Sequence, residues 1–155
     1  RLVRDAHIGV LWEGTSNIVA LDLATRAFAK DDGAAVLSTA LSGILNETEA
    51  VPESLKSGLN DAAERAIAYV SEAAANPEIE VQAQRAAGAL YHATSAAVMA
   101  FEGDRLARQN GGSTRLSLAE LVLECRLSAQ DPLASHGAPA DETLLSLLAD
   151  SCNSL

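Results

Sequence analysis

The feature that most constrains the fold of this chain is a long run of small side chains that recur at helical spacing. Between residues 77 and 109, they recur at alternating intervals of four and three residues, at Ala83, Ala87, Leu90, Thr94, Ala97 and Phe101. This spacing places them on one face of a helix, and because most of them are small, a neighbouring helix can approach closely. The run therefore predicts a helix that lies within a bundle.

Other segments on both sides of this run also have helical spacing, with glycine or proline between them. The predicted helices cover residues 16–30, 34–47, 52–76, 77–109 and 115–129, with the end of a helix over 1–8 and a short helix near the C-terminus. Strand-forming runs are missing, and aromatic residues make up only 3% of the chain. We therefore predict an all-α fold, an antiparallel helical bundle. The residues expected in its core are Leu41, Ile44, Leu59, Ile67, Leu90, Phe101, Leu121 and Cys125.

The charge of the chain is strongly acidic and argues against nucleic-acid binding. The net charge is −10, and residues 31–155 hold seven basic and eighteen acidic residues. Affinity for nucleic acid depends mainly on lysine and arginine that displace counterions from phosphates, so we expect none here. The one basic cluster is formed by Arg105, Arg108 and Arg115, at the turn between two predicted helices. A solvated helix end is the favoured interpretation of this cluster, and a docking spot for an anion is the alternative.

The cysteines and histidines show no pattern of a metal site or of a disulfide framework. Cys125 and Cys152 lie far apart in the sequence, and His7, His92 and His136 are scattered singly. We expect reduced thiols, a cytoplasmic location and no bound metal. No apolar run approaches the roughly 18 residues that span a bilayer, and no secretory signal is visible. Because the chain begins with arginine and runs straight into a helical pattern, we expect it to be the tail of a longer protein.

One short stretch, WEGTSN, combines residues that are suited to chemistry. Glu13 lies in a predicted loop between two helices, Gly14 permits close approach of the backbone to a bound molecule, and Thr15 or Ser16 can cap the following helix. A carboxylate beside Trp12 is at risk of desolvation, which raises its pKa and makes it a better base. From the residues alone, Glu13 is either such a base or an ordinary glutamate at the start of a helix.

Residues 1 to about 30, RLVRDAHIGVLWEGTSNIVALDLATR, resemble the C-terminal end of the acyl-CoA dehydrogenase family. The matching residues, in order and spacing, are Arg4, Asp5, Ala6, Glu13, Gly14, Thr15, Asn17 and Ile18. Trp12 stands where many members have tyrosine. The resemblance implies that residues 1–30 end the catalytic helical domain of such an enzyme, and that residues 31–155 form an additional α-helical extension. The flavin-binding β-domain and the first helical domain of the family are not in this chain.

The resemblance also implies a reaction and a role for each matching residue. Glu13 would be the base that removes the α-proton of an acyl-CoA while a hydride leaves the β-carbon for FAD. Gly14 and Trp12 would contact the substrate. The residues that would contact FAD are Thr15, Ser16 and Asn17. Further implied partners are an electron-transfer flavoprotein or a similar acceptor, and other copies of the chain in a homo-oligomer.

The long extension makes the chain more similar to the AidB-like branch of this family. That branch implies a different function, a flavoprotein with a role in nucleic-acid binding or stress protection. A third alternative is that the extension serves assembly and carries no catalysis. Because most of the flavin and substrate site would lie in the absent domains, we expect this chain by itself to be inactive.

Overall fold

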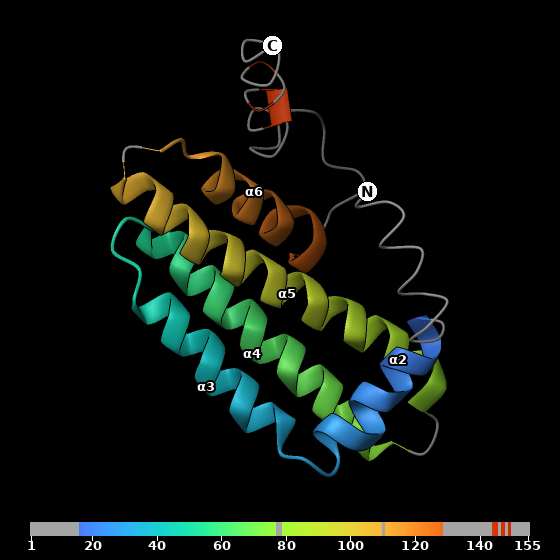
Figure 1. The fold of residues 1–155 in the computed structure, drawn as a ribbon. Helices are drawn as coiled ribbons and strands as arrows, with labels where there is room; N and C mark the ends of the chain where they lie inside the picture. The colour runs from blue at the N-terminus through green and yellow to red at the C-terminus, as the bar shows by residue number, and fades with distance from the viewer. Residues whose placement is uncertain are drawn as a thin grey trace, which may run out of the picture.

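The computed structural model describes residues 16–76, 79–109 and 111–128, together with the single positions 144, 145, 147 and 149 (Figure 1). The predicted helix end at residues 1–8 and the stretch from Trp12 to Thr15 lie outside the described residues. The four single positions near the C-terminus are helical, where the last short helix is predicted.

The described part of the chain is helical and contains no strand, which confirms the all-α prediction. The helices are α2 (Ser16–Asp22), α3 (Gly33–Asn46), α4 (Glu53–Ala75), α5 (Ile79–Arg108) and α6 (Thr114–Val122). Two segments have the wider turns of a π-helix, η1 (Leu23–Phe28) directly after α2 and η2 (Leu123–Leu127) directly after α6. The predicted boundaries agree with these elements to within a few residues.

Helices α3, α4, α5 and α6 run antiparallel to their neighbours in the sequence and lie side by side (Figure 1). The segment formed by α2 and η1 packs across one end of the bundle, where α2 contacts α5 and η1 contacts α4 (Figure 1). The long helix α5 is central, since it contacts every other element named here. The arrangement is the antiparallel bundle predicted from the spacing of apolar residues.

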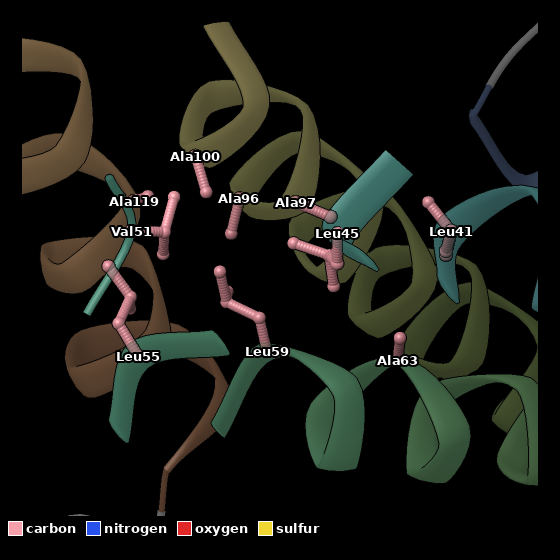
Figure 2. Close-up of a cluster of buried hydrophobic side chains, with 10 residues drawn as sticks. All are labelled: Leu41, Leu45, Val51, Leu55, Leu59, Ala63, Ala96, Ala97, Ala100 and Ala119. Atoms are coloured by element: carbon pink, nitrogen blue, oxygen red, sulfur yellow. The ribbon is translucent and has the colours of Figure 1, made fainter. Parts of the chain in front are cut away.

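The core of the bundle consists of two clusters along α4 and α5. The first cluster, shown in Figure 2, contains Leu41, Leu45, Val51, Leu55, Leu59, Ala63, Ala96, Ala97, Ala100 and Ala119. The second cluster contains Ala66, Ile67, Val70, Ala73, Ala86, Leu90 and Ala93. The first cluster joins leucines of α3 and α4 to alanines of α5, and the second joins Ile67 and Val70 of α4 to Ala86, Leu90 and Ala93 of α5. The alanines let the helices approach one another closely.

The buried face of α5 is wider than the predicted seam. Within that seam, Ala83, Leu90 and Ala97 are buried, whereas Ala87, Thr94 and Phe101 are only half-buried. The other buried positions described in α5 are Ala86, Ala93, Ala96, Ala100, Gly103 and Asp104. A seam describes contact with one neighbour, and α5 has neighbours on several sides, so more of its surface is covered.

The predicted core is largely confirmed, with one clear error. Leu41, Leu59, Ile67 and Leu90 are buried, and Ile44 packs against the first cluster. Phe101 and Leu121 are half-buried. Cys125 is exposed, so its placement in the core is wrong. That prediction extended α-helical spacing from Leu121, but η2 begins at Leu123, and its wider turns rotate the following side chains away from the expected face.

The helix predicted over residues 16–30 also buries a different face from the one expected. The intervals of three, four and three residues that join Ile18, Leu21, Thr25 and Phe28 predict one buried face, yet Ile18 is 59% exposed and Thr25 is exposed. The buried residues are Ala20 and Ala24, which face the bundle. Ala20 and Ala24 are four residues apart, so the buried face keeps regular helical spacing, but Ala20 is two residues from Ile18 and therefore lies on nearly the opposite side of the helix.

Candidate functional site

Of the site predicted from the sequence, the structure describes only the last two residues. Of the residues assigned to catalysis, substrate and cofactor, Ser16 and Asn17 lie in the first turn of α2, and both are exposed. Trp12, Glu13, Gly14 and Thr15 lie outside the described residues. The hydroxyl of Ser16 and the carboxamide of Asn17 are therefore accessible to a ligand.

The orientation of α2 follows from its alanines. Ala20 is 2% exposed, and Ala24 in η1 is 1% exposed, so this side of the segment faces the bundle. Ile18 and Val19 are exposed on the remaining surface of α2. One turn further along, Arg26 Nη2 donates a hydrogen bond to Asp22 Oδ2 at 2.6 Å. Because both side chains are exposed, this pair contributes little to stability.

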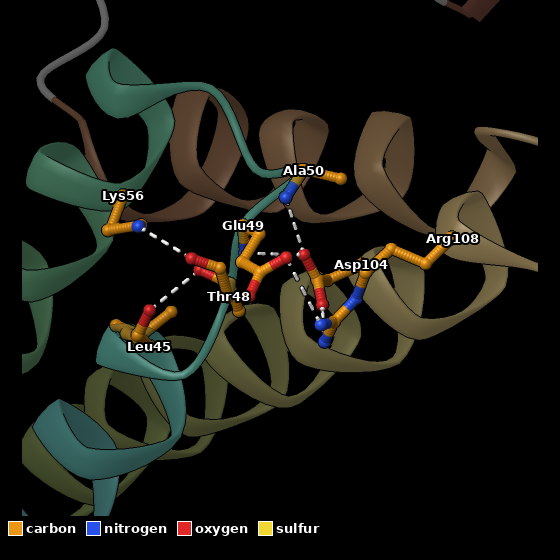
Figure 3. A network of polar contacts seen from close by, with 7 residues as sticks. All are labelled: Leu45, Thr48, Glu49, Ala50, Lys56, Asp104 and Arg108. Carbon is orange, nitrogen blue, oxygen red and sulfur yellow. Dashed lines mark hydrogen bonds and ion pairs between the residues drawn. The ribbon is translucent and has the colours of Figure 1, made fainter.

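A buried network of hydrogen bonds and ion pairs is centred on Asp104, in the last part of α5 (Figure 3). Its side chain is fully buried. The Oδ1 atom of Asp104 accepts hydrogen bonds from the backbone N–H groups of Glu49 at 2.7 Å and Ala50 at 2.6 Å. The Oδ2 atom of Asp104 forms an ion pair with the guanidinium of Arg108, which also lies 3.5 Å from Glu49 Oε2.

The loop between α3 and α4 is held by a second set of contacts. The buried Thr48 donates its hydroxyl hydrogen to the carbonyl oxygen of Leu45 at 2.6 Å. Lys56 Nζ donates to the carbonyl oxygen of Thr48 at 2.9 Å. We call the contacts of Thr48, Lys56, Asp104 and Arg108 with this loop the loop clamp. It attaches residues 48–50 to the end of α5 (Figure 3).

The electrostatics of the loop clamp keep Asp104 ionised. Burial by itself raises the pKa of a carboxyl group, because it disfavours the charged form. The two backbone N–H groups and the guanidinium of Arg108 more than offset this effect, so the pKa of Asp104 is below its ordinary value. A carboxylate whose two oxygens are both held in this way cannot serve as a proton donor at neutral pH. The loop clamp is therefore a structural feature.

The loop clamp was not predicted from the sequence, although the sequence contains a signal for it. The seam of α5 runs through Thr94, Ala97 and Phe101 at intervals of three and four residues, and the next interval of three falls on Asp104. An acidic residue on a buried face must be paired or hydrogen-bonded. Arg108, one turn further on, was the partner visible in the sequence, whereas the backbone groups of Glu49 and Ala50 were not.

The basic cluster at the turn from α5 to α6 is partnered inside the bundle. Arg108 pairs with Asp104, and Arg115 Nη1 lies 3.3 Å from Glu102 Oε2. The guanidinium of Arg105 lies 4.4 Å from the centre of the Phe101 ring. These contacts support the interpretation of the cluster as a helix end rather than a docking spot for an anion.

The described residues contain no group of three side chains that could hold a metal ion. In the same part of the chain, the ring of His92 lies 5.3 Å from that of Tyr91, in an edge-on arrangement, and Cys125 is an exposed thiol. No helix in the described ranges is long and apolar enough to cross a membrane.

The chain matches no protein-family model, no curated protein and no solved structure. An antiparallel bundle supports many unrelated functions, so its fold assigns no chemistry. The argument for a function therefore depends on the residues of the chain itself.

Proposed function

We propose that this chain is the C-terminal part of an FAD-dependent acyl-CoA dehydrogenase, which introduces a double bond between the α- and β-carbons of an acyl-CoA thioester. The observation that carries the proposal is the ordered match of residues 4–18 to the end of that family's catalytic domain. The helical fold of the described part is compatible with it, since the family's last domain is also helical.

Glu13 is the residue that would remove the α-proton. A carboxylate becomes a stronger base when the apolar chain of a substrate excludes water from the site. The backbone N–H of Glu13 would donate a hydrogen bond to the thioester carbonyl, which stabilises the negative charge that develops there as the proton leaves. Gly14 and Trp12 would line the substrate beside this base.

The described end of the predicted site fits a role in holding FAD. Ser16 and Asn17 offer an exposed hydroxyl and an exposed carboxamide in the first turn of α2, and both groups can form hydrogen bonds with a flavin nucleotide. Thr15 would add a second hydroxyl. When bound, FAD would supply the acceptor for the hydride that leaves the β-carbon, and an electron-transfer flavoprotein or a similar protein would then accept the electrons.

The extension, residues 31–155, is proposed to support assembly of a cytoplasmic homo-oligomer rather than to bind nucleic acid. A role in nucleic-acid binding, as in the AidB-like branch, needs basic residues that are available to phosphates. In the described residues, Arg108 and Arg115 are instead paired with carboxylates, and acidic residues predominate throughout the extension. These two observations favour the dehydrogenase over the AidB-like alternative.

The test is the substitution Glu13→Gln in the complete protein that contains this chain. Glutamine keeps the size of the side chain but cannot accept the proton, so flavin reduction by an acyl-CoA should slow by about 10²- to 10⁴-fold, while flavin content stays unchanged. Stopped-flow absorbance of the flavin under anaerobic conditions measures this rate. The matched control is Glu120→Gln on the exposed side of α6, which should leave the rate unchanged.

Flavin reduction at the wild-type rate by the Glu13→Gln protein would contradict the proposal, because it would place the base elsewhere. Reduction of added FAD by acyl-CoA in the presence of this chain alone would contradict the separate expectation that the chain by itself is inactive.

A further inference from the structure

A small pocket opens between α4, α5 and η2, at the opposite end of α6 from its turn with α5. Its volume is about 190 Å³. Arg65 and Tyr69 come from α4, Ala89 comes from α5, and Arg126 and Leu127 come from η2. The pocket is thus lined by two arginines and by an apolar wall that includes Ala66 and Ala89.

The two arginines of this pocket differ from most other described arginines. Arg26, Arg108 and Arg115 each pair with a carboxylate. Among the described residues, Arg65 and Arg126 form no ion pair, although acidic residues outnumber basic ones almost two to one in the chain. Arg65 uses one of its donors on the carbonyl oxygen of Leu127 at 3.1 Å, which leaves the others available.

Two carboxylates that lie close to Arg65 in the sequence do not pair with it. Asp61 and Glu64 line a neighbouring open groove, of which Arg65 is also a lining residue. Neither forms an ion pair with Arg65 in the structure. Arg65 and Arg126, from different elements, therefore line one pocket, and none of its described lining residues is acidic.

We propose that this pocket binds a small organic carboxylate with a flat apolar body. A guanidinium group matches the geometry of a carboxylate through two parallel hydrogen bonds. The alanines and Tyr69 provide contact for an apolar group, and the volume of the pocket has room for a group about the size of one aromatic ring. This site is independent of the proposed dehydrogenase activity, because none of its residues belongs to the stretch that resembles that family.

Benzoate is a suitable probe, because it combines a carboxylate with one aromatic ring. Titration of the ¹⁵N-labelled chain with benzoate should produce saturable shifts of the amide signals of Tyr69 and Leu127. Arg126→Gln should weaken binding by about tenfold or more, since hydrogen bonds to a charged group are among the stronger ones. Ala89→Leu should abolish binding by filling the pocket without changing any charge.

The controls separate this site from a general effect of charge. Arg115→Gln removes an arginine that is already paired with Glu102, at the other end of α6, and it should leave the affinity for benzoate unchanged. Unchanged amide spectra away from the pocket show that each variant folds. Equal affinity of the wild type, Arg126→Gln and Ala89→Leu for benzoate would overturn the proposal, as would shifts that do not saturate. If inorganic phosphate bound as tightly as benzoate, the proposal that the pocket recognises an apolar body would be refuted.

Discussion

Removal of the Asp104 carboxylate should destabilise the bundle more than removal of its arginine partner. In Asp104→Ala, the backbone N–H groups of Glu49 and Ala50 lose their acceptor, at 2.7 and 2.6 Å in the structure. A hydrogen bond to a charged group contributes roughly 1.5 to 3 kcal/mol, and water can reach part of this loop, so we expect a loss of about 2 to 4 kcal/mol in the free energy of unfolding. Urea unfolding followed by circular dichroism measures this change.

Arg108→Gln is the matched control for this prediction. Arg108→Gln leaves the buried Oδ2 atom of Asp104 without its ion-pair partner, but the side chain of Arg108 is 42% exposed, so water can replace part of this contact. We expect a loss of about 1 to 2 kcal/mol, smaller than for Asp104→Ala. A loss below about 1 kcal/mol for Asp104→Ala, or equal losses for the two variants, would refute the assignment of the loop clamp as a main stabilising contact.

The dependence of stability on pH gives the same prediction an independent check. The pKa of Asp104 is lower in the folded chain than its ordinary value of 3.8. Its contribution to stability is therefore complete above that value and is lost as the pH falls toward the lower, folded pKa. In Asp104→Asn this part of the acid-induced loss should be absent. An unchanged difference in stability between neutral and acidic pH would contradict the lowered pKa.

Two further predictions concern close packing and charge. Gly103→Ala should destabilise the chain by about 1 to 3 kcal/mol, because the new Cβ would lie 2.7 Å from Leu116 Cδ2 and 3.1 Å from the backbone nitrogen of Leu116. A Cβ added at Gly43 on α3 meets nothing within 4 Å, so Gly43→Ala should stabilise the chain by about 0.5 to 1 kcal/mol. Urea unfolding measures both variants, and equal effects of the two substitutions would be inconsistent with the close packing at Gly103. Residues 31–155 should not bind duplex DNA at physiological salt, and a submicromolar, salt-sensitive affinity by fluorescence anisotropy would show this to be wrong.

The spacing of apolar residues was sufficient to predict the all-α bundle and the order of its helices, because each long helix repeats the same local pattern many times. It was not sufficient in η2, where the helix widens. There, Cys125 was assigned to the face that regular spacing would give, and the π-helical turns of η2 changed it. Such a local change depends on tertiary packing, which sequence spacing does not record. The error at Ile18 has another cause, since the small residues Ala20 and Ala24, and not the large Ile18, form the face of this segment that packs against the bundle.

The polar contacts were harder to predict than the apolar ones. Asp104 meets backbone groups that lie 54 and 55 residues earlier in the chain. Backbone N–H groups are present at almost every position, so the sequence does not identify which of them will meet a buried carboxylate. The pocket of Arg65 and Arg126 also joins separate helices, and its two arginines are unremarkable until the fold brings them together. For the stretch from Trp12 to Asn17, the assignment to catalysis and FAD binding remains a prediction from resemblance.

The alanines of α5 have a consequence for how this helix is held in position along its axis. Alanine has no rotamers to lose on burial, so the central helix enters the core at almost no cost in side-chain entropy. The same surface is smooth, and apart from Leu90 it offers few large side chains to resist a shift of the helix by one turn against α4. Hydrogen bonds are directional, and those of Asp104 with Glu49 and Ala50 can form in one position only. The loop clamp therefore sets the axial register of a helix whose own packing surface leaves that register weakly determined.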